Sequence, residues 1–200
     1  PVSCSGWRPA ASRPSPDFES PPCGAETLTT VASDSTVTVT GAISDKAGTQ
    51  GKIKLVGGGT LVLATANTFS GGAYVDTGVL QVTCAGALGD GAITVKGGTS
   101  AANQLQFNFS AIHSKGTITY ANDITVENGG DENHYQLQFG PHYNDSAHKS
   151  DRQTLKLTGD ITCAGDLYMT LNNSWGTAGE PDLRLKNVTV DGLFYLAYPG

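Results

Sequence analysis

The densest group of side chains that could do chemistry lies between residues 131 and 151. Its members are histidines and carboxylates, namely Asp131, Glu132, His134, His142, Asp145, His148 and Asp151. Neutral imidazole and carboxylate coordinate zinc and related divalent ions, so His134, His142, Asp145 and His148 are candidate metal ligands. Their spacing matches no established metal motif, and no strand or helix is expected to hold them in place. We therefore expect a solvated loop here, with a metal site as the alternative.

A second candidate is a pair of carboxylates, Asp123 and Asp160, which occupy equivalent bends in two similar stretches of sequence. Enzymes that cleave glycosidic bonds use two carboxylates about 5 to 9.5 Å apart. Short polar residues in bends, including Asn122 and Asn187, also bond to nearby backbone groups. We expect that structural role for all four residues and assign no catalytic residue. A polysaccharide-cleaving enzyme is the alternative.

Other chemistries lack their sequence motifs. No Gly-x-Ser-x-Gly elbow occurs, and the run 57–59 of three glycines lacks the Lys and Ser/Thr of a phosphate-binding loop, so no cofactor is expected. Cys84 and Cys163 both sit in Thr-Cys-Ala-Gly and are expected to be small buried residues near strand ends. Whether Cys4 and Cys23 form a disulfide is left open by the sequence.

The charge balance excludes one class of partner. The chain has a formal net charge of −6, and its 12 Lys and Arg residues are scattered, whereas phosphate backbones require clustered cations. Nucleic acid is therefore not an expected partner. No apolar run approaches the roughly 18 residues that a membrane-spanning helix needs.

The elements that would position these residues follow a repeated pattern. A short alternating strand is followed by a loop, a second strand, a tight bend and a third strand. The pattern predicts strands at 104–107, 117–120 and 124–126, then 136–139, 154–157 and 161–163, then 168–171, 183–185 and 188–190. The recurrence of roughly 27–37 residues is typical of stacked repeats. With 26 glycines and no convincing amphipathic helix, the chain is expected to be all-β.

Similar strands are predicted in the first half, starting at Thr36. They cover 36–40, 52–55, 60–63, 79–82 and 92–95, with Ile53, Leu55, Leu61 and Leu63 directed to the core. The bends are too short to reverse a strand as a hairpin, which favours a parallel β-helix with three short strands per coil over a sandwich. We expect this β-helix over 28–200, after a Pro/Ser-rich lead at 1–27, with further coils beyond residue 200.

One stretch resembles a known family. It comprises Gly57-Gly58-Gly59-Thr60-Leu61-Val62-Leu63-Ala64-Thr65-Ala66-Asn67-Thr68-Phe69-Ser70-Gly71-Gly72, then Val75, Gly78, Leu80-Gln81-Val82 and Ala85-Gly86-Ala87-Leu88-Gly89-Asp90-Gly91. This order resembles the autotransporter-associated β-strand repeat, and residues 41–98 match it best. The resemblance implies a right-handed parallel β-helix in the passenger region of a bacterial autotransporter or a similarly secreted protein. It also implies that the repeat assists export and has no active-site residues.

The expected function is therefore that of a stiff scaffold, secreted or on the bacterial cell surface. Loops at 98–116, 128–153 and 172–182 would supply an adhesive surface, and the partner would be a cell-surface glycan or protein. Tyr143 and Trp175 in these loops could stack on sugars or on protein partners. Missing C-terminal coils or a translocator region would complete the parent chain. The alternative is a β-helix protein that binds or cleaves glycans.

Overall fold

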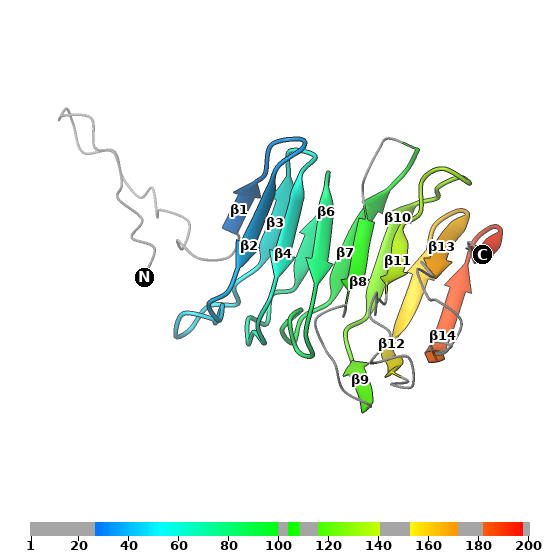
Figure 1. Cartoon of the computed structure of the whole chain (residues 1–200). Helices are drawn as coiled ribbons and strands as arrows, with labels where there is room; N and C mark the ends of the chain where they lie inside the picture. Colours follow the sequence, from blue (N-terminus) through cyan, green and yellow to red (C-terminus); the bar gives the residue numbers. More distant parts are fainter. Residues whose placement is uncertain (1–26, 100–103, 109–115, 141–152, 172–181, 198–200) are drawn as a thin grey trace, which may run out of the picture.

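A computed structural model describes residues 27–99, 104–108, 116–140, 153–171 and 182–197. Its described part is all-β and forms two sheets of parallel strands without any helix (Figure 1). Accordingly, none of the described segments forms a helix that could cross a membrane. Outside the described residues lie 1–26 of the predicted lead, 100–103 and 109–115 of the first predicted loop, 141–152 of the second and 172–181 of the third.

The two sheets take alternate strands of the chain. Sheet A contains, in spatial order, β1 (Thr27–Thr30), β3 (Ile53–Val56), β5 (Ala73–Val75), β7 (Ile93–Gly97), β10 (Ile124–Asn128), β12 (Gln153–Cys163) and β14 (Asp182–Val190), with β9 (Gly116–Tyr120) paired to β12. Sheet B contains β2 (Thr36–Val39), β4 (Thr60–Leu63), β6 (Val79–Val82), β8 (Gln104–Asn108), β11 (Leu137–Gly140), β13 (Leu167–Leu171) and β15 (Phe194–Ala197). One strand from each sheet, with its connections, makes one repeat.

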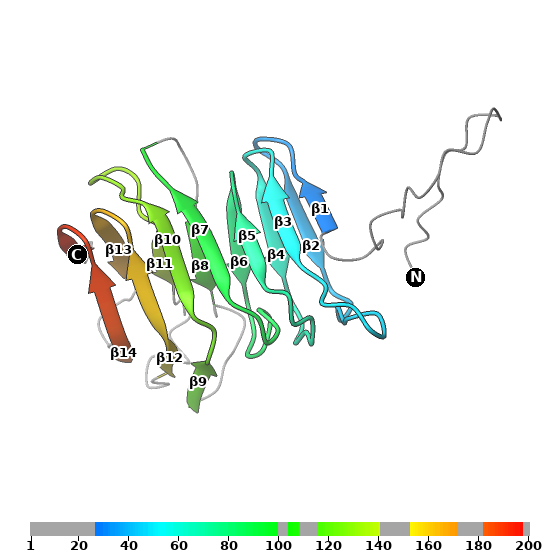
Figure 2. The same cartoon turned by 180° about the vertical axis from the view of Figure 1, so that it is seen from behind.

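Each strand pairs with the equivalent strand of the next repeat. In sheet B, Leu61 pairs with Leu80, which pairs with Leu105. Figures 1 and 2 show the strands side by side, advancing steadily from the N-terminal to the C-terminal end of the array. Backbone hydrogen bonds therefore run between repeats, and equivalent side chains form rows across each sheet.

The core lies between the two sheets and follows from the alternation of apolar and polar residues along each strand. The predicted core residues Ile53, Leu55, Leu61 and Leu63 are all buried, which confirms that prediction. Farther along, Phe107 stacks on the ring of Phe139 with centroids 5.2 Å apart. Like residues thus pack on like residues from one repeat to the next.

The predicted strands of the second half are confirmed, but two details differ. First, β1 lies before the earliest predicted strand. It was not predicted because Thr27–Thr30 contains a single aliphatic residue and shows little alternation. Second, the prediction of three separate strands in every repeat is only partly correct. The second and third predicted strands both lie in sheet A, and they form one continuous strand of 11 residues in β12 and of 9 residues in β14.

In β12, the two predicted strands are joined through a short irregular stretch, at which the pairing with β14 changes register. The first part of β12 pairs with β9 and the last part with β10, and the register against β14 shifts between Leu157 and Asp160. A Cβ on Gly159 would lie 2.1 Å from the carbonyl oxygen of Asn122, so only glycine fits this approach. The predicted bend is therefore an irregularity inside a strand rather than the end of one.

Buried asparagines connect the repeats at their bends. Asn67 accepts a hydrogen bond from the Ile43 amide at 2.8 Å and donates to the Ala87 carbonyl at 2.6 Å. Asn122 donates in the same way to the carbonyls of Gly89 and Gly91. These bonds satisfy backbone groups of neighbouring repeats, which confirms the structural role predicted for Asn122.

Gly72 offers a test of this close stacking. Its φ is +81°, and a Cβ there would lie 2.0 Å from the Ala92 carbonyl oxygen of the next repeat. Gly72→Ala should therefore lower the free energy of unfolding by more than the roughly 1–2 kcal/mol expected from a left-handed backbone alone. Gly48→Ala is the matched control, because Gly48 has the same φ in open space. Equal losses in urea unfolding of the two variants would contradict the close packing.

Candidate functional site

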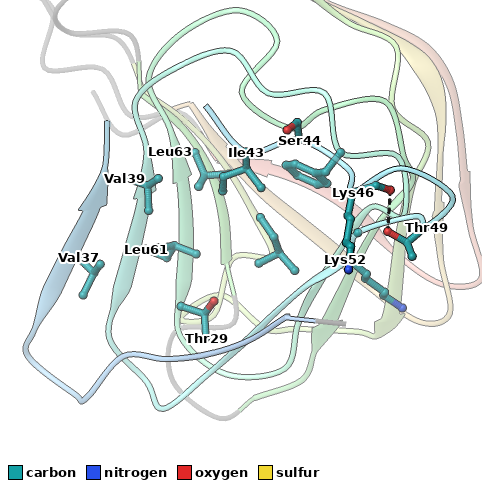
Figure 3. Close-up of a pocket in the computed structure, with 13 residues that line it drawn as sticks. Thr29, Val37, Val39, Ile43, Ser44, Lys46, Thr49, Lys52, Leu61 and Leu63 are labelled. Carbon is teal, nitrogen blue, oxygen red and sulfur yellow. Dashed lines mark hydrogen bonds between the residues drawn. The ribbon is translucent and has the colours of Figure 1, made fainter. Parts of the chain in front are cut away.

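A cavity of about 390 Å³ lies at the N-terminal end of the described array, beside the first strands of the two sheets. Figure 3 shows Val37, Val39, Leu61 and Leu63 of sheet B gathered around it with Thr29 of sheet A. Val37 pairs in register with the buried Leu61 but is itself 43% exposed. The cavity thus lies at the end of the apolar core, and six of its 13 lining residues are aliphatic.

The carboxylate beside this cavity, that of Asp45, is engaged in structural bonds. Asp45 accepts hydrogen bonds from the Gly51 amide at 2.6 Å and from the Ser70 hydroxyl at 2.6 Å. These bonds, that of Ser70 foremost, lower the pKa of the Asp45 carboxyl. A carboxylate held in this way is a weak base, so Asp45 is poorly suited to act as a general base at this cavity.

The carboxylates considered for glycan cleavage also have structural partners. Asp123 accepts a hydrogen bond from the Asp160 amide at 2.8 Å. Asp160 accepts from the Asn187 side chain at 2.8 Å and lies 3.1 Å from the Lys186 ammonium, and these two contacts, Asn187 first, lower the pKa of Asp160. A general acid requires a raised pKa. The geometry therefore favours the predicted role of both residues in the bends.

Of the candidate metal ligands, only His134 is described. Its Nδ1 lies 2.6 Å from Asp131 Oδ1, which also accepts a hydrogen bond from the Asn133 amide. The Asn133 bond is the main cause that lowers the pKa of Asp131. Among the described residues, no three His, Cys, Asp or Glu side chains converge as a metal site. His142, Asp145 and His148 lie outside the described residues, as do Tyr143 and Trp175.

The two described cysteines are free thiols; the prediction of small buried residues is confirmed for Cys163, whereas Cys84 is only half-buried. Cys163 ends β12 within the core, and burial raises the pKa of its thiol to about 11. Cys84 packs against the same core, and burial raises the pKa of that thiol as well. Both thiols are therefore protonated and poorly nucleophilic at neutral pH.

A shallow groove lies over the outer face of sheet A. It is lined by the threonines of one row, Thr125, Thr162 and Thr189, beside Glu127 and Asp191. The hydroxyls of Thr162 and Thr125 are 3.4 Å apart. This row lies among charged residues, and its hydroxyls are partly used on one another.

Sequence reasoning missed a row of amides on the outer face of sheet B. Gln81, Gln106 and Gln138 lie in register on β6, β8 and β11. Gln81 Nε2 donates to Gln106 Oε1 at 3.0 Å, and Gln106 Nε2 donates to Gln138 Oε1 at 2.5 Å. The repeated Gln-x-Gln pattern was a signal for this row, although it served only to define strands.

Asp45 gives a test of the carboxylate bonds near the cavity. Because its pKa is lower in the folded chain than in the unfolded chain, Asp45 stabilises the fold above the ordinary carboxyl pKa of about 4. This stabilisation is lost as the pH falls through the folded pKa. Asp45→Asn should therefore reduce the loss of melting temperature below about pH 4. Asp34→Asn is the control, and an unchanged acid profile in Asp45→Asn would contradict the inference.

Comparison with known proteins gives no match: the chain aligns with no protein-family model, no curated protein and no solved structure.

Proposed function

We propose that the chain forms a right-handed parallel β-helix and serves as a stiff scaffold on a bacterial cell surface. Two parallel sheets that take alternate strands, with register kept from repeat to repeat, support this architecture. Links between parallel strands of one sheet are right-handed in about 98% of cases, which supports the handedness. The resemblance of residues 41–98 to the autotransporter-associated repeat supports the setting.

The observation that carries the proposal is the common origin of three chain insertions. The segments 109–115, 141–152 and 172–181 follow β8, β11 and β13, which are neighbours in sheet B. Asn108 pairs in register with Gly140, and Phe139 pairs with Leu171, so these strands end close together. Adjacent strands lie about 4.8 Å apart. All three insertions therefore begin at the carboxyl ends of neighbouring strands, on the same side of sheet B.

The return points of the insertions are aligned in the same way. Gly116 of β9 pairs with Gln153 of β12, and Thr154 pairs with Asp182 of β14. A rigid scaffold that holds the ends of several adjacent segments can present them as one recognition surface. Their sequences include His142, Tyr143 and Trp175, which are residue types suited to contacts with glycans or proteins.

Stiffness follows from the bonding between repeats. Main-chain hydrogen bonds and apolar rows connect each repeat to the next, so ordered repeats support one another. For an exported passenger, ordering of successive repeats outside the cell would favour outward movement. This step rests on the family resemblance and on no contact within the chain.

Replacement of one insertion tests the scaffold role. If residues 141–152 are replaced by Asn-Gly, the melting temperature should change by only a few degrees, because loop length contributes weakly to stability. Binding of the purified chain to a glycan array or to immobilised extracellular-matrix proteins should fall. The matched control keeps the length and composition of 141–152 but scrambles their order.

Two outcomes would count against the proposal. A collapse of the far-ultraviolet β-sheet signal after replacement would mean that the insertion is part of the fold. Unchanged binding by both the replaced and the scrambled chains would mean that the insertion is not the recognition surface.

A further inference from the structure

The two sheets differ sharply in charge. The strands of sheet A contain Lys54, Lys96, Glu127, Lys156, Asp160, Asp182, Arg184 and Lys186. The strands of sheet B contain no Lys, Arg, Asp or Glu at all. Solubility favours charged residues on exposed strands, and charge is also the usual protection of a sheet against association. The uncharged outer face of sheet B therefore requires a physical explanation.

The centre of this face is the half-buried amide row Gln81–Gln106–Gln138, which is flanked in register by Val62 and Thr170, only 8% and 7% exposed. Gln106 Nε2 also donates to Gln104 Oε1 at 3.2 Å, so its side chain is held by three glutamines. Each amide has two N–H donors and an oxygen with two lone pairs. The bonds within the row leave the oxygen of Gln81 and the NH₂ group of Gln138 for other partners. Because the half-buried side chains are already ordered, binding to them costs little further conformational entropy.

Two tyrosines extend this face toward the C-terminal end. Tyr168 of β13 pairs in register with Tyr195 of β15, and their ring centroids are 5.1 Å apart. Tyr168 lies two residues before Thr170, which pairs with Gln138, so the tyrosines and the amide row share one side of the sheet. The Tyr195 residue is 42% exposed. Tyrosine combines an apolar ring with a polar hydroxyl, which suits contact with amphipathic ligands.

We propose that this face of sheet B binds an extended, uncharged polysaccharide. Sugar hydroxyls both donate and accept hydrogen bonds, as amides do, and the apolar faces of sugar rings pack on tyrosine. The three glutamines lie on adjacent strands about 4.8 Å apart, which suits a polymer of regular units. The absence of charge on the sheet B strands matches a neutral polymer. The inference needs only the two-sheet fold and does not depend on the three insertions.

The residue types on this face favour a polysaccharide over a second copy of the chain. Stable protein interfaces bury roughly 800 Å² per partner around aromatic or arginine anchors. On this outer face the aromatic residues are confined to β13 and β15, while the three middle strands present Val79, Asn108 and the glutamines. Polar amides without apolar anchors provide little energy for such an interface.

Affinity electrophoresis of the full chain tests the proposal. Gels would contain hydroxyethylcellulose or laminarin as neutral polymers, or alginate as an acidic one. We expect retardation by a neutral polymer and none by alginate. Gln106→Ala and, at the exposed edge, Tyr195→Ala should each weaken binding about three- to tenfold, the effect of one net hydrogen bond or ring contact. Thr125→Ala on the outer face of sheet A is the matched control and should bind like the parent chain.

Several results would overturn the proposal. They are the absence of retardation by both neutral polymers, equal retardation by alginate, and equal weakening by Thr125→Ala. A concentration-dependent dimer that Gln106→Ala abolishes would identify a second copy as the occupant instead. Replacement of residues 141–152 separates this proposal from the scaffold function, because neutral-polymer binding by this face should survive that change.

Discussion

In-register pairing between equivalent strands of successive repeats is the interaction on which the rest of the structure depends. It places Leu61, Leu80 and Leu105 in one row and Thr94, Thr125 and Thr162 in another. A shift of one residue would move an entire apolar row to solvent. The glycines at close approaches and the buried asparagines at the bends are consequences of this pairing, because both bring neighbouring backbones together without leaving polar groups unsatisfied.

Much of the fold could be predicted from alternation alone. The strands of the second half, the buried leucines of β3 and β4 and the all-β class follow from side chains that point to opposite faces of a strand. The strand β1 and the fusion within β12 could not be predicted. Residues 27–30 have too little alternation, and the effect of Gly159 depends on the carbonyl of Asn122, which lies in another repeat.

The site residues were harder to predict, because their roles depend on partners distant in sequence. A structural role was predicted for Asp123 and Asp160, with acid–base chemistry as the alternative, but their actual partners, a backbone amide and the Asn187 side chain, could not be predicted. The glutamine row joins residues 25 and 32 positions apart. Since the intervals differ, the sequence does not show that these amides meet. The described side chains with reactive groups mostly stabilise the fold, whereas the uncharged amides form a row on the outer face of sheet B.

The strands of sheet A lengthen toward the C-terminal end, from 4 residues in β1 to 11 in β12 and 9 in β14. Because each repeat is bonded only to its neighbours, longer strands make the later junctions stronger than the early ones. A pulling force along the array would therefore be expected to separate the N-terminal repeats, which have short strands in sheet A, before the C-terminal repeats, which have long ones. Within the described part of the chain, this expected gradient of mechanical strength belongs to sheet A, because the strands of sheet B keep a length of 4 or 5 residues.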